Sequence, residues 1–393
     1  MGNIGQNIAK RHRDASIVLI KVLKRLGMEV NAMSEDIYHR LAQILDTLPN
    51  GFPATENGVE IKILEKIFSP EEAKLFCDLR LELETPEQIA TRTGRPLEGL
   101  KDTLQDMADK GQCGEVRLGD TSLFKMIPWI LGIWEFQVEH LDEELARLNK
   151  EYEPVYGRQF FSTTPQYMQT VLVEEAIPNE QEALPHKRVS AIIEGGQSFR
   201  VVDCICKKAQ GLIGNPCDRP VEVCMAIAPV PGYFEQFEIG RVISKEEAWK
   251  ILELSEEKAL VHLSSNFQQG QFFICNCCKC CCPVLQGITE LNIPASLVIN
   301  SLYYAEKDED LCTDCGTCAE ERCQVNAIVE EDGEYRFVRE ACIGCGLCVS
   351  ACPSEAVTMV RKDEAQLSKP PATEADWFEE RGRIRGVDFT PYK

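Results

Sequence analysis

Eight cysteines between residues 311 and 353 constrain this chain more than any other feature. They form two near-copies, each with three cysteines at every third position and a fourth further on. The copies are Cys312-x2-Cys315-x2-Cys318-x4-Cys323 and Cys342-x2-Cys345-x2-Cys348-x3-Cys352-Pro353. A loop with this spacing can curl so that three thiolates converge on one metal centre. A pair of zinc sites is the alternative, but zinc does not need a triplet plus a distant cysteine twice.

The two copies resemble the bacterial-type ferredoxin domain, which carries two [4Fe-4S] clusters. In that domain the fourth cysteine of each copy binds the other cluster. The resemblance implies that one cluster takes Cys312, Cys315, Cys318 and Cys352, and that the second takes Cys342, Cys345, Cys348 and Cys323. The loop of the second cluster departs from the usual pattern, because four residues precede Cys323 and Gln324 stands where proline is usual.

Ten further cysteines lie upstream in two compact groups. The first group is Cys204-x-Cys206-x10-Cys217-x6-Cys224, and Lys207, Lys208 and Arg219 lie among its members. Cationic groups near a cluster stabilise its thiolates and its reduced state. We therefore expect these four cysteines to be the main ligands of one further cubane.

The second upstream group has six cysteines within eight residues: Cys275, Cys277, Cys278, Cys280, Cys281 and Cys282. A cubane uses four thiolates, so six cysteines this close together cannot all serve one cubane. The pattern predicts another cluster or the ligands of an unusual one, giving one or two clusters beyond the ferredoxin pair. A site of reactive thiols without metal is the alternative.

Composition and charge limit the class of protein. The chain has 393 residues and a formal net charge of −21, which disfavours nucleic acid and anionic membranes and favours a basic partner. No apolar run reaches the roughly 18 residues that span a bilayer, so the protein is predicted not to be transmembrane. The apolar run near the start is shorter than that of a signal peptide. We expect a reducing cytoplasm, and an anaerobe because oxygen attacks exposed cubanes.

The sequence predicts an α+β multidomain protein with a cysteine-rich α/β middle region. The predicted segments are a basic amphipathic helix over residues 1–33, a helical winged-helix-like domain over 34–160, the cysteine-rich region over 161–304, the ferredoxin-like 2[4Fe-4S] domain over 305–362, and an extended tail over 363–393. The first helix is expected to pack on its own domain or a subunit, with a membrane surface or an acidic partner as the alternative.

The winged-helix expectation rests on the order of elements between residues 69 and 126. Three helices are predicted to open at Pro70, Thr85 and Pro96, and a hairpin over residues 113–126 follows. The third helix is more acidic than basic, whereas a helix that reads DNA needs side chains that bind bases and phosphates. We therefore expect this region to serve packing or a protein contact and not nucleic acid.

Residues 35–362 as a whole resemble a family of multi-cluster 4Fe-4S proteins of anaerobic bacteria and archaea. The residues that carry the resemblance are Asp203 to Cys206, Cys217 to Cys224, residues 274–282 and the ferredoxin-like repeat. The expected function is electron transfer through several clusters to protein redox partners, as part of an oxidoreductase complex. The alternatives are a reductase subunit with a catalytic cluster or thiol site at residues 275–282, and a redox-responsive winged-helix regulator. No residue is assigned a catalytic role.

Overall fold

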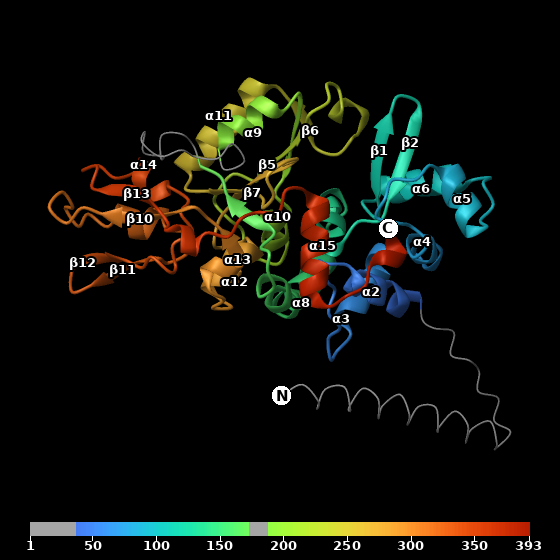
Figure 1. Cartoon of the computed structure of the whole chain (residues 1–393), viewed down its shortest axis with the longest axis horizontal. Helices are drawn as coiled ribbons and strands as arrows, with labels where there is room; N and C mark the ends of the chain where they lie inside the picture. Colours follow the sequence, from blue (N-terminus) through green and yellow to red (C-terminus); the bar gives the residue numbers. More distant parts are fainter. Residues whose placement is uncertain (1–36, 173–187) are drawn as a thin grey trace, which may run out of the picture.

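The computed structural model describes residues 37–172 and 188–393. It has helices at one end, a seven-stranded sheet in the middle and two small antiparallel sheets at the other end (Figure 1). This arrangement confirms a mixed α+β protein with a helical N-terminal region. The predicted helix over residues 1–33 lies outside the described residues.

The N-terminal region is a group of short helices followed by a hairpin and one long helix. Its elements are α2 (Ile37–Thr47), α3 (Val59–Ile67), α4 (Pro70–Phe76), α5 (Pro86–Thr93), α6 (Leu100–Asp109), β1 (Gly114–Leu118), β2 (Thr121–Lys125), α7 (Trp134–Phe136) and α8 (Glu143–Phe161). Phe52 anchors the core, with ring centroids 5.5 Å from Trp129 and 5.1 Å from Tyr152. Such aromatic contacts add to the stabilisation that comes from burial alone.

Two helix starts in this region follow the signals in the sequence. Ser69 and Thr85 each cap the helix that begins at the following proline, and each forms a capping box with the residue three positions on. The third helix differs from expectation. It begins at Leu100 after Gly99, which has a positive φ, and Leu97 is exposed because it precedes the helix.

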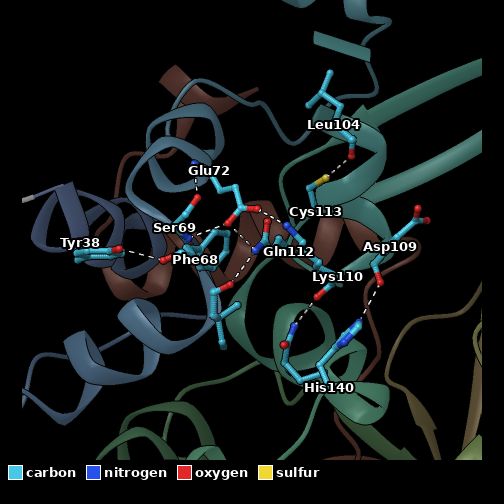
Figure 2. A network of polar contacts seen from close by, with 12 residues as sticks. Tyr38, Phe68, Ser69, Glu72, Leu104, Asp109, Lys110, Gln112, Cys113 and His140 are labelled. Carbon is cyan, nitrogen blue, oxygen red and sulfur yellow. Dashed lines mark hydrogen bonds and ion pairs between the residues drawn. The ribbon is translucent and has the colours of Figure 1, made fainter. Parts of the chain in front are cut away.

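A polar network joins these helices to the start of the hairpin (Figure 2). The side-chain nitrogen of Gln112 donates to the carbonyl oxygen of Ile67 at 2.7 Å and to the carboxylate of Glu72 at 3.1 Å. Burial alone would raise the pKa of Glu72, but hydrogen bonds from Lys110, Ser69 and Gln112 lower it to about 2. Cys113 is buried beside Leu104, and Cys77 is also buried.

The central sheet carries three of the ten upstream cysteines, Cys224, Cys275 and Cys277. Its strands are, in spatial order, β6 (Arg241–Ile243), β4 (Ser198–Asp203), β5 (Glu222–Ala228), β8 (Phe273–Cys277), β7 (Val261–Ser265), β3 (Met168–Thr170) and β9 (Ile299–Asn300). Neighbouring strands are antiparallel except for β3 and β9. Helices α9 (Val189–Gly195) and α11 (Lys245–Glu257) share one hydrophobic core with this sheet. Helices α8, α10 (Ile205–Leu212) and α12 (Pro283–Thr289) contribute to a second core.

The ferredoxin-like region follows directly from the central sheet. Strand β10 (Tyr303–Lys307) pairs with β13 (Val357–Arg361), and β11 (Ile328–Glu331) forms a hairpin with β12 (Glu334–Phe337). The short helix α14 (Leu347–Ser350) contains Cys348, the third cysteine of the second copy. A side chain at Gly344 would place its Cβ 2.2 Å from the carbonyl oxygen of Tyr303, so the cysteine loop can approach β10 only with glycine there.

The C-terminal segment is not the extended tail that its polar composition predicted. It contains helix α15 (Glu374–Arg385), which lies between the N-terminal helices and the central sheet (Figure 1). Trp377 and Arg381 of this helix are almost completely buried. Arg381 donates to the carbonyl oxygens of Pro49 at 3.2 Å and Pro165 at 2.9 Å, so the segments that follow α2 and α8 meet at one guanidinium. The helix was missed because its two buried anchors stand among charged residues.

None of the helices in the described ranges has both the length and the apolar character needed to cross a bilayer.

Candidate metal centres

One set of ferredoxin-like cysteines surrounds a cavity. Cys323, Cys342, Cys345 and Cys348 all line it, and apolar side chains such as Ile328 and Leu347 complete the wall. Burial raises the pKa of Cys345 to about 12, and the sulfurs of Cys342 and Cys323 add to the effect. A metal that binds here must therefore displace protons, which couples its affinity to pH. These are the four cysteines that the resemblance assigns to the second cluster.

Backbone N–H groups point at the sulfurs of this set. Ala305 and Gly344 each donate to Cys342 Sγ at 3.4 Å, and Ala327 donates to Cys323 Sγ at 3.2 Å. Such bonds stabilise a thiolate and raise the potential of a cluster. The N–H groups of these loops thus favour thiolates at Cys342 and Cys323, although burial favours the protonated thiol at Cys345.

The other ferredoxin-like set lies closer to solvent. Cys315 is exposed, and Cys312, Cys318 and Cys352 are partly buried. Hydrogen bonds from Thr317 lower the pKa of Cys315, and Cys352 lies near enough to oppose this shift electrostatically. The four sulfurs therefore form a more open site than the cavity around Cys345.

Gln324 joins the ferredoxin-like region to the central cysteines. Its side chain is buried, and its Oε1 accepts from the backbone N–H of Lys279 at 3.1 Å. Lys279 also donates from Nζ to the side-chain oxygen of Asn326 at 3.0 Å. The departure from the usual proline thus has a structural reason, because the residue after Cys323 holds the loop that carries Cys278 and Cys280.

Six of the ten upstream cysteines form a closed ring of interacting thiols. Cys204 interacts with Cys206 and Cys224, Cys275 with Cys224 and Cys277, and Cys282 with Cys206 and Cys277. Hydrogen bonds from Cys224 and Cys277 lower the pKa of Cys275 to about 6, against the effect of burial. The ring holds more sulfur ligands than one cubane uses.

The register of the central sheet explains how distant cysteines meet in this ring. Met225 of β5 pairs with Ile274 of β8, so the next residues along the two strands, Cys224 and Cys275, lie opposite each other. Side chains alternate between the faces of a strand, so Cys275 and Cys277 share a face. Cys204 follows directly after β4 and occupies the N-cap position of helix α10, which carries Cys206.

The remaining four cysteines form a tighter group. The sulfurs of Cys217, Cys278, Cys280 and Cys281 all lie within 4.8 Å of one another. Cys217 Sγ lies 3.7 Å from Cys278 Sγ and 3.5 Å from Cys280 Sγ. Arg219 Nη1 lies 3.8 Å from Cys280 Sγ at the exposed side of the group.

The structure therefore groups the upstream cysteines differently from their order in the sequence. Cys204, Cys206 and Cys224 lie in the ring, whereas Cys217 lies with three cysteines of the later group. The run from residue 278 to 282 contributes to both centres, since Cys282 belongs to the ring. The expected set of Cys204, Cys206, Cys217 and Cys224 does not come together at one place.

A buried lysine lies between the two upstream centres. Lys207 is only 3% exposed, and its Nζ donates to the carbonyl oxygen of Asn276 at 3.0 Å. Burial opposes its charge, but the sulfurs of Cys204 and Cys278, one from each centre, raise its pKa. Within residues 37–172 and 188–393 it forms no ion pair with a carboxylate, so the thiolates are the negative charges that compensate it.

Glu135 adds a protonatable group near the ring, which sequence analysis did not single out. Burial of its carboxyl group raises its pKa to about 8, and Cys275 contributes in the same direction. Gly132 N donates to Glu135 Oε2 at 2.9 Å. The carboxyl can therefore hold a proton near neutral pH beside the ring.

Comparison with known proteins identifies part of the chain. A family model described as a 4Fe-4S binding domain matches residues 335–358, which include Cys342, Cys345, Cys348 and Cys352. An uncharacterised ferredoxin of Methanocaldococcus jannaschii is 42% identical over 53 residues. That match covers 13% of this chain and 32% of the relative, so the chain spans about a third of the length of the curated relative it matches.

The chain thus carries a 4Fe-4S binding domain near its C-terminus. The family model covers the second cysteine triplet and the cysteine that follows it, and the cavity at Cys345 lies in the same region. The ring and the four-cysteine group lie outside that model's residues. How many clusters the chain binds, and which cysteines bind each one, stay predictions.

Proposed function

We propose that the protein relays electrons through several iron–sulfur clusters. Two clusters would lie in the ferredoxin-like region and a third in the ring of six cysteines. The observation that carries this proposal is the hydrogen bond from Lys279 to Gln324, because it joins the central cysteine loop to the residue that follows Cys323. Clusters held this close can exchange electrons in single steps, while the chain tunes their potentials through burial and hydrogen bonds.

The exposure of the two ferredoxin-like sites gives the relay a direction. The open site at Cys315 is the one a protein partner can approach, and the enclosed site at Cys345 faces inward. Acidic side chains such as Glu309 and Glu320 are exposed near the open site. We infer a redox partner with a basic docking surface, within an oxidoreductase system of an anaerobe's cytoplasm.

Iron and sulfide counts test the number of clusters. Protein purified without oxygen should bind about twelve irons, four for each of three clusters. In stopped-flow experiments the central cluster should be reduced more slowly in the Cys345→Ser variant than in the wild type. Only eight irons, with the ring cysteines readily alkylated under anaerobic conditions, would contradict the relay.

The ring also favours a second candidate, a reductase whose catalytic cluster lies among these cysteines. It has two more sulfurs than a cubane uses, and Glu135 can hold a proton beside Cys275. The two spare thiols would allow an unusual cluster or a reactive thiol pair, and a proton donor beside them is what substrate reduction needs. The test is a Glu135→Gln variant, which should lose turnover and its pH dependence while its iron content stays unchanged.

A winged-helix regulator has less support. The order of α4, α5, α6 and the β1–β2 hairpin suits that shape, so we propose a winged-helix-like region that makes protein contacts. Helix α6 presents Asp102 and Asp106, and Lys110 at its end is paired with Glu72 at 2.6 Å. Tight, salt-sensitive binding to duplex DNA would contradict this view.

A further inference from the structure

The four-cysteine group is too compact for the corners of a cubane. Besides the 3.5 and 3.7 Å separations from Cys217, Cys280 Sγ lies 3.3 Å from Cys278 Sγ and 3.6 Å from Cys281 Sγ. In a cubane each thiolate binds a different iron, so the four ligand sulfurs stand around the whole cluster. In this group they surround a single point.

These separations match the edges of one tetrahedron. Four thiolates bound to one ion at about 2.3 Å lie about 3.8 Å from one another. The four separations given above all fall near that edge, and all six pairs lie within 4.8 Å. Tetrahedral sites with four thiolates hold zinc or a single iron.

The surroundings fit a site that keeps its ion. Cys278 and Cys281 are buried, Cys217 is partly buried and Cys280 alone is exposed. Four thiolates on a divalent ion leave a net charge of −2, and Arg219 and Lys207 are the cations that face them. All four positions come from the chain, as in structural metal sites, which leave no position for substrate.

We propose that Cys217, Cys278, Cys280 and Cys281 bind one tetrahedral metal ion, zinc or iron, separate from every iron–sulfur cluster. The ion fastens the loop before β5 to the loop after β8. That holds residues 278–282 so that Cys282 points into the ring and Lys279 reaches Gln324. The site therefore positions the central cluster relative to the ferredoxin-like region.

Metal analysis of a matched pair of variants tests the site. Cys280 and Cys315 are both exposed cysteines, one in the proposed ion site and one in the ferredoxin-like region. Cys280→Ser should remove one metal ion per chain and leave the iron–sulfur absorbance unchanged. Cys315→Ser should lower the iron–sulfur absorbance and keep that ion. Loss of one zinc or of one iron decides which metal is bound.

Two results would overturn the proposal. One is the loss of about four irons together with sulfide in Cys280→Ser, which would place a cubane at this site. The other is wild-type protein with neither zinc nor a mononuclear iron signal. If the Cys280→Ser variant is unstable, X-ray absorption at the zinc or iron edge of the wild-type protein tests the site instead. For zinc it should show four sulfurs at about 2.3 Å. A cubane at this site would contradict the single-ion proposal but not the electron relay. Eight irons in clusters plus one such ion would support the single-ion proposal and contradict the relay.

Discussion

The ferredoxin-like region and the central sheet bring cysteine side chains together in different ways. In the ferredoxin-like region each predicted site takes three cysteines from one loop and a fourth from the other copy, so the repeated spacing predicts which sulfurs meet. In the central region strand register and a helix start decide the grouping, which separates Cys217 from its neighbours in the sequence. The sequence therefore predicts which cysteines lie together when one loop carries most of them, but not when the pairing of strands brings them together.

Removing all metal should produce the largest difference between the two regions, measured as the loss of folded structure in each. The hydrophobic core of the central sheet has 18 buried residues, whereas the core of the ferredoxin-like region has eight. The free energy of metal binding is largely folding energy in small metal domains. After anaerobic chelation, hydrogen exchange should show lost protection in β10–β13 and retained protection in β4 and β5. Equal loss in both regions would remove this distinction.

Single cysteine substitutions should show the next largest difference. Cys345→Ser should lose about four irons, because each sulfur around its cavity is needed for a cubane. Cys282→Ser should lose less iron, since five ring sulfurs remain where a cubane needs four. Iron analysis and the EPR spectrum of the reduced protein measure both. Identical losses would mean that the ring has no spare ligand.

Replacing the buried lysine should weaken the central centres alone. Lys207→Met removes the charge that faces both groups of thiolates and keeps much of the side-chain volume. Loss of a group that supports metal ligands usually costs about 10–100-fold in metal affinity.

Chelator competition monitored by iron release would measure this change. Lys208→Met is the matched control, because that neighbour donates to the carbonyl oxygen of Val138 and is partly exposed. Equal effects of the two substitutions would show that general charge, and not the buried position, matters.

Restoring the usual proline should have the smallest effect. Gln324→Pro removes one hydrogen bond to Lys279, which costs about 1 kcal/mol. Both ferredoxin-like clusters should remain, while electron transfer to the central cluster becomes slower. Denaturant unfolding and stopped-flow reduction would measure the two effects. An unchanged transfer rate would show that this contact does not set the path.

Much of the fold could be read from the sequence because the signals are local. Ser69 and Thr85 each mark a helix start with a capping box. The turn at Asp332 and Gly333 marks the β11–β12 hairpin. Thr373 marks the start of helix α15 with a capping box as well, but the helix was missed because its polar composition suggested a tail and the partners of Trp377 and Arg381 lie more than 200 residues away.

The candidate centres were predictable to different depths. That the ten upstream cysteines would gather was clear from their density, and the 4Fe-4S domain was clear from its spacing. Their division into a ring and a compact group needed the pairing of β5 with β8, which no single stretch encodes. Glu135 had no signal, because its significance comes only from burial near Cys275.

Helix α15 gives the ferredoxin-like region the topology of an insertion. The chain enters it straight from β9, and on leaving it Ser368 and Pro371 accept hydrogen bonds from Asn300 and Gln268 before the helix closes on Pro49. A module fixed at its entry and its exit cannot swing between donor and acceptor as a carrier on a flexible arm does. In the proposed relay, tunnelling distances inside the molecule would then be constant, and the diffusive step would occur at the exposed Cys315 end.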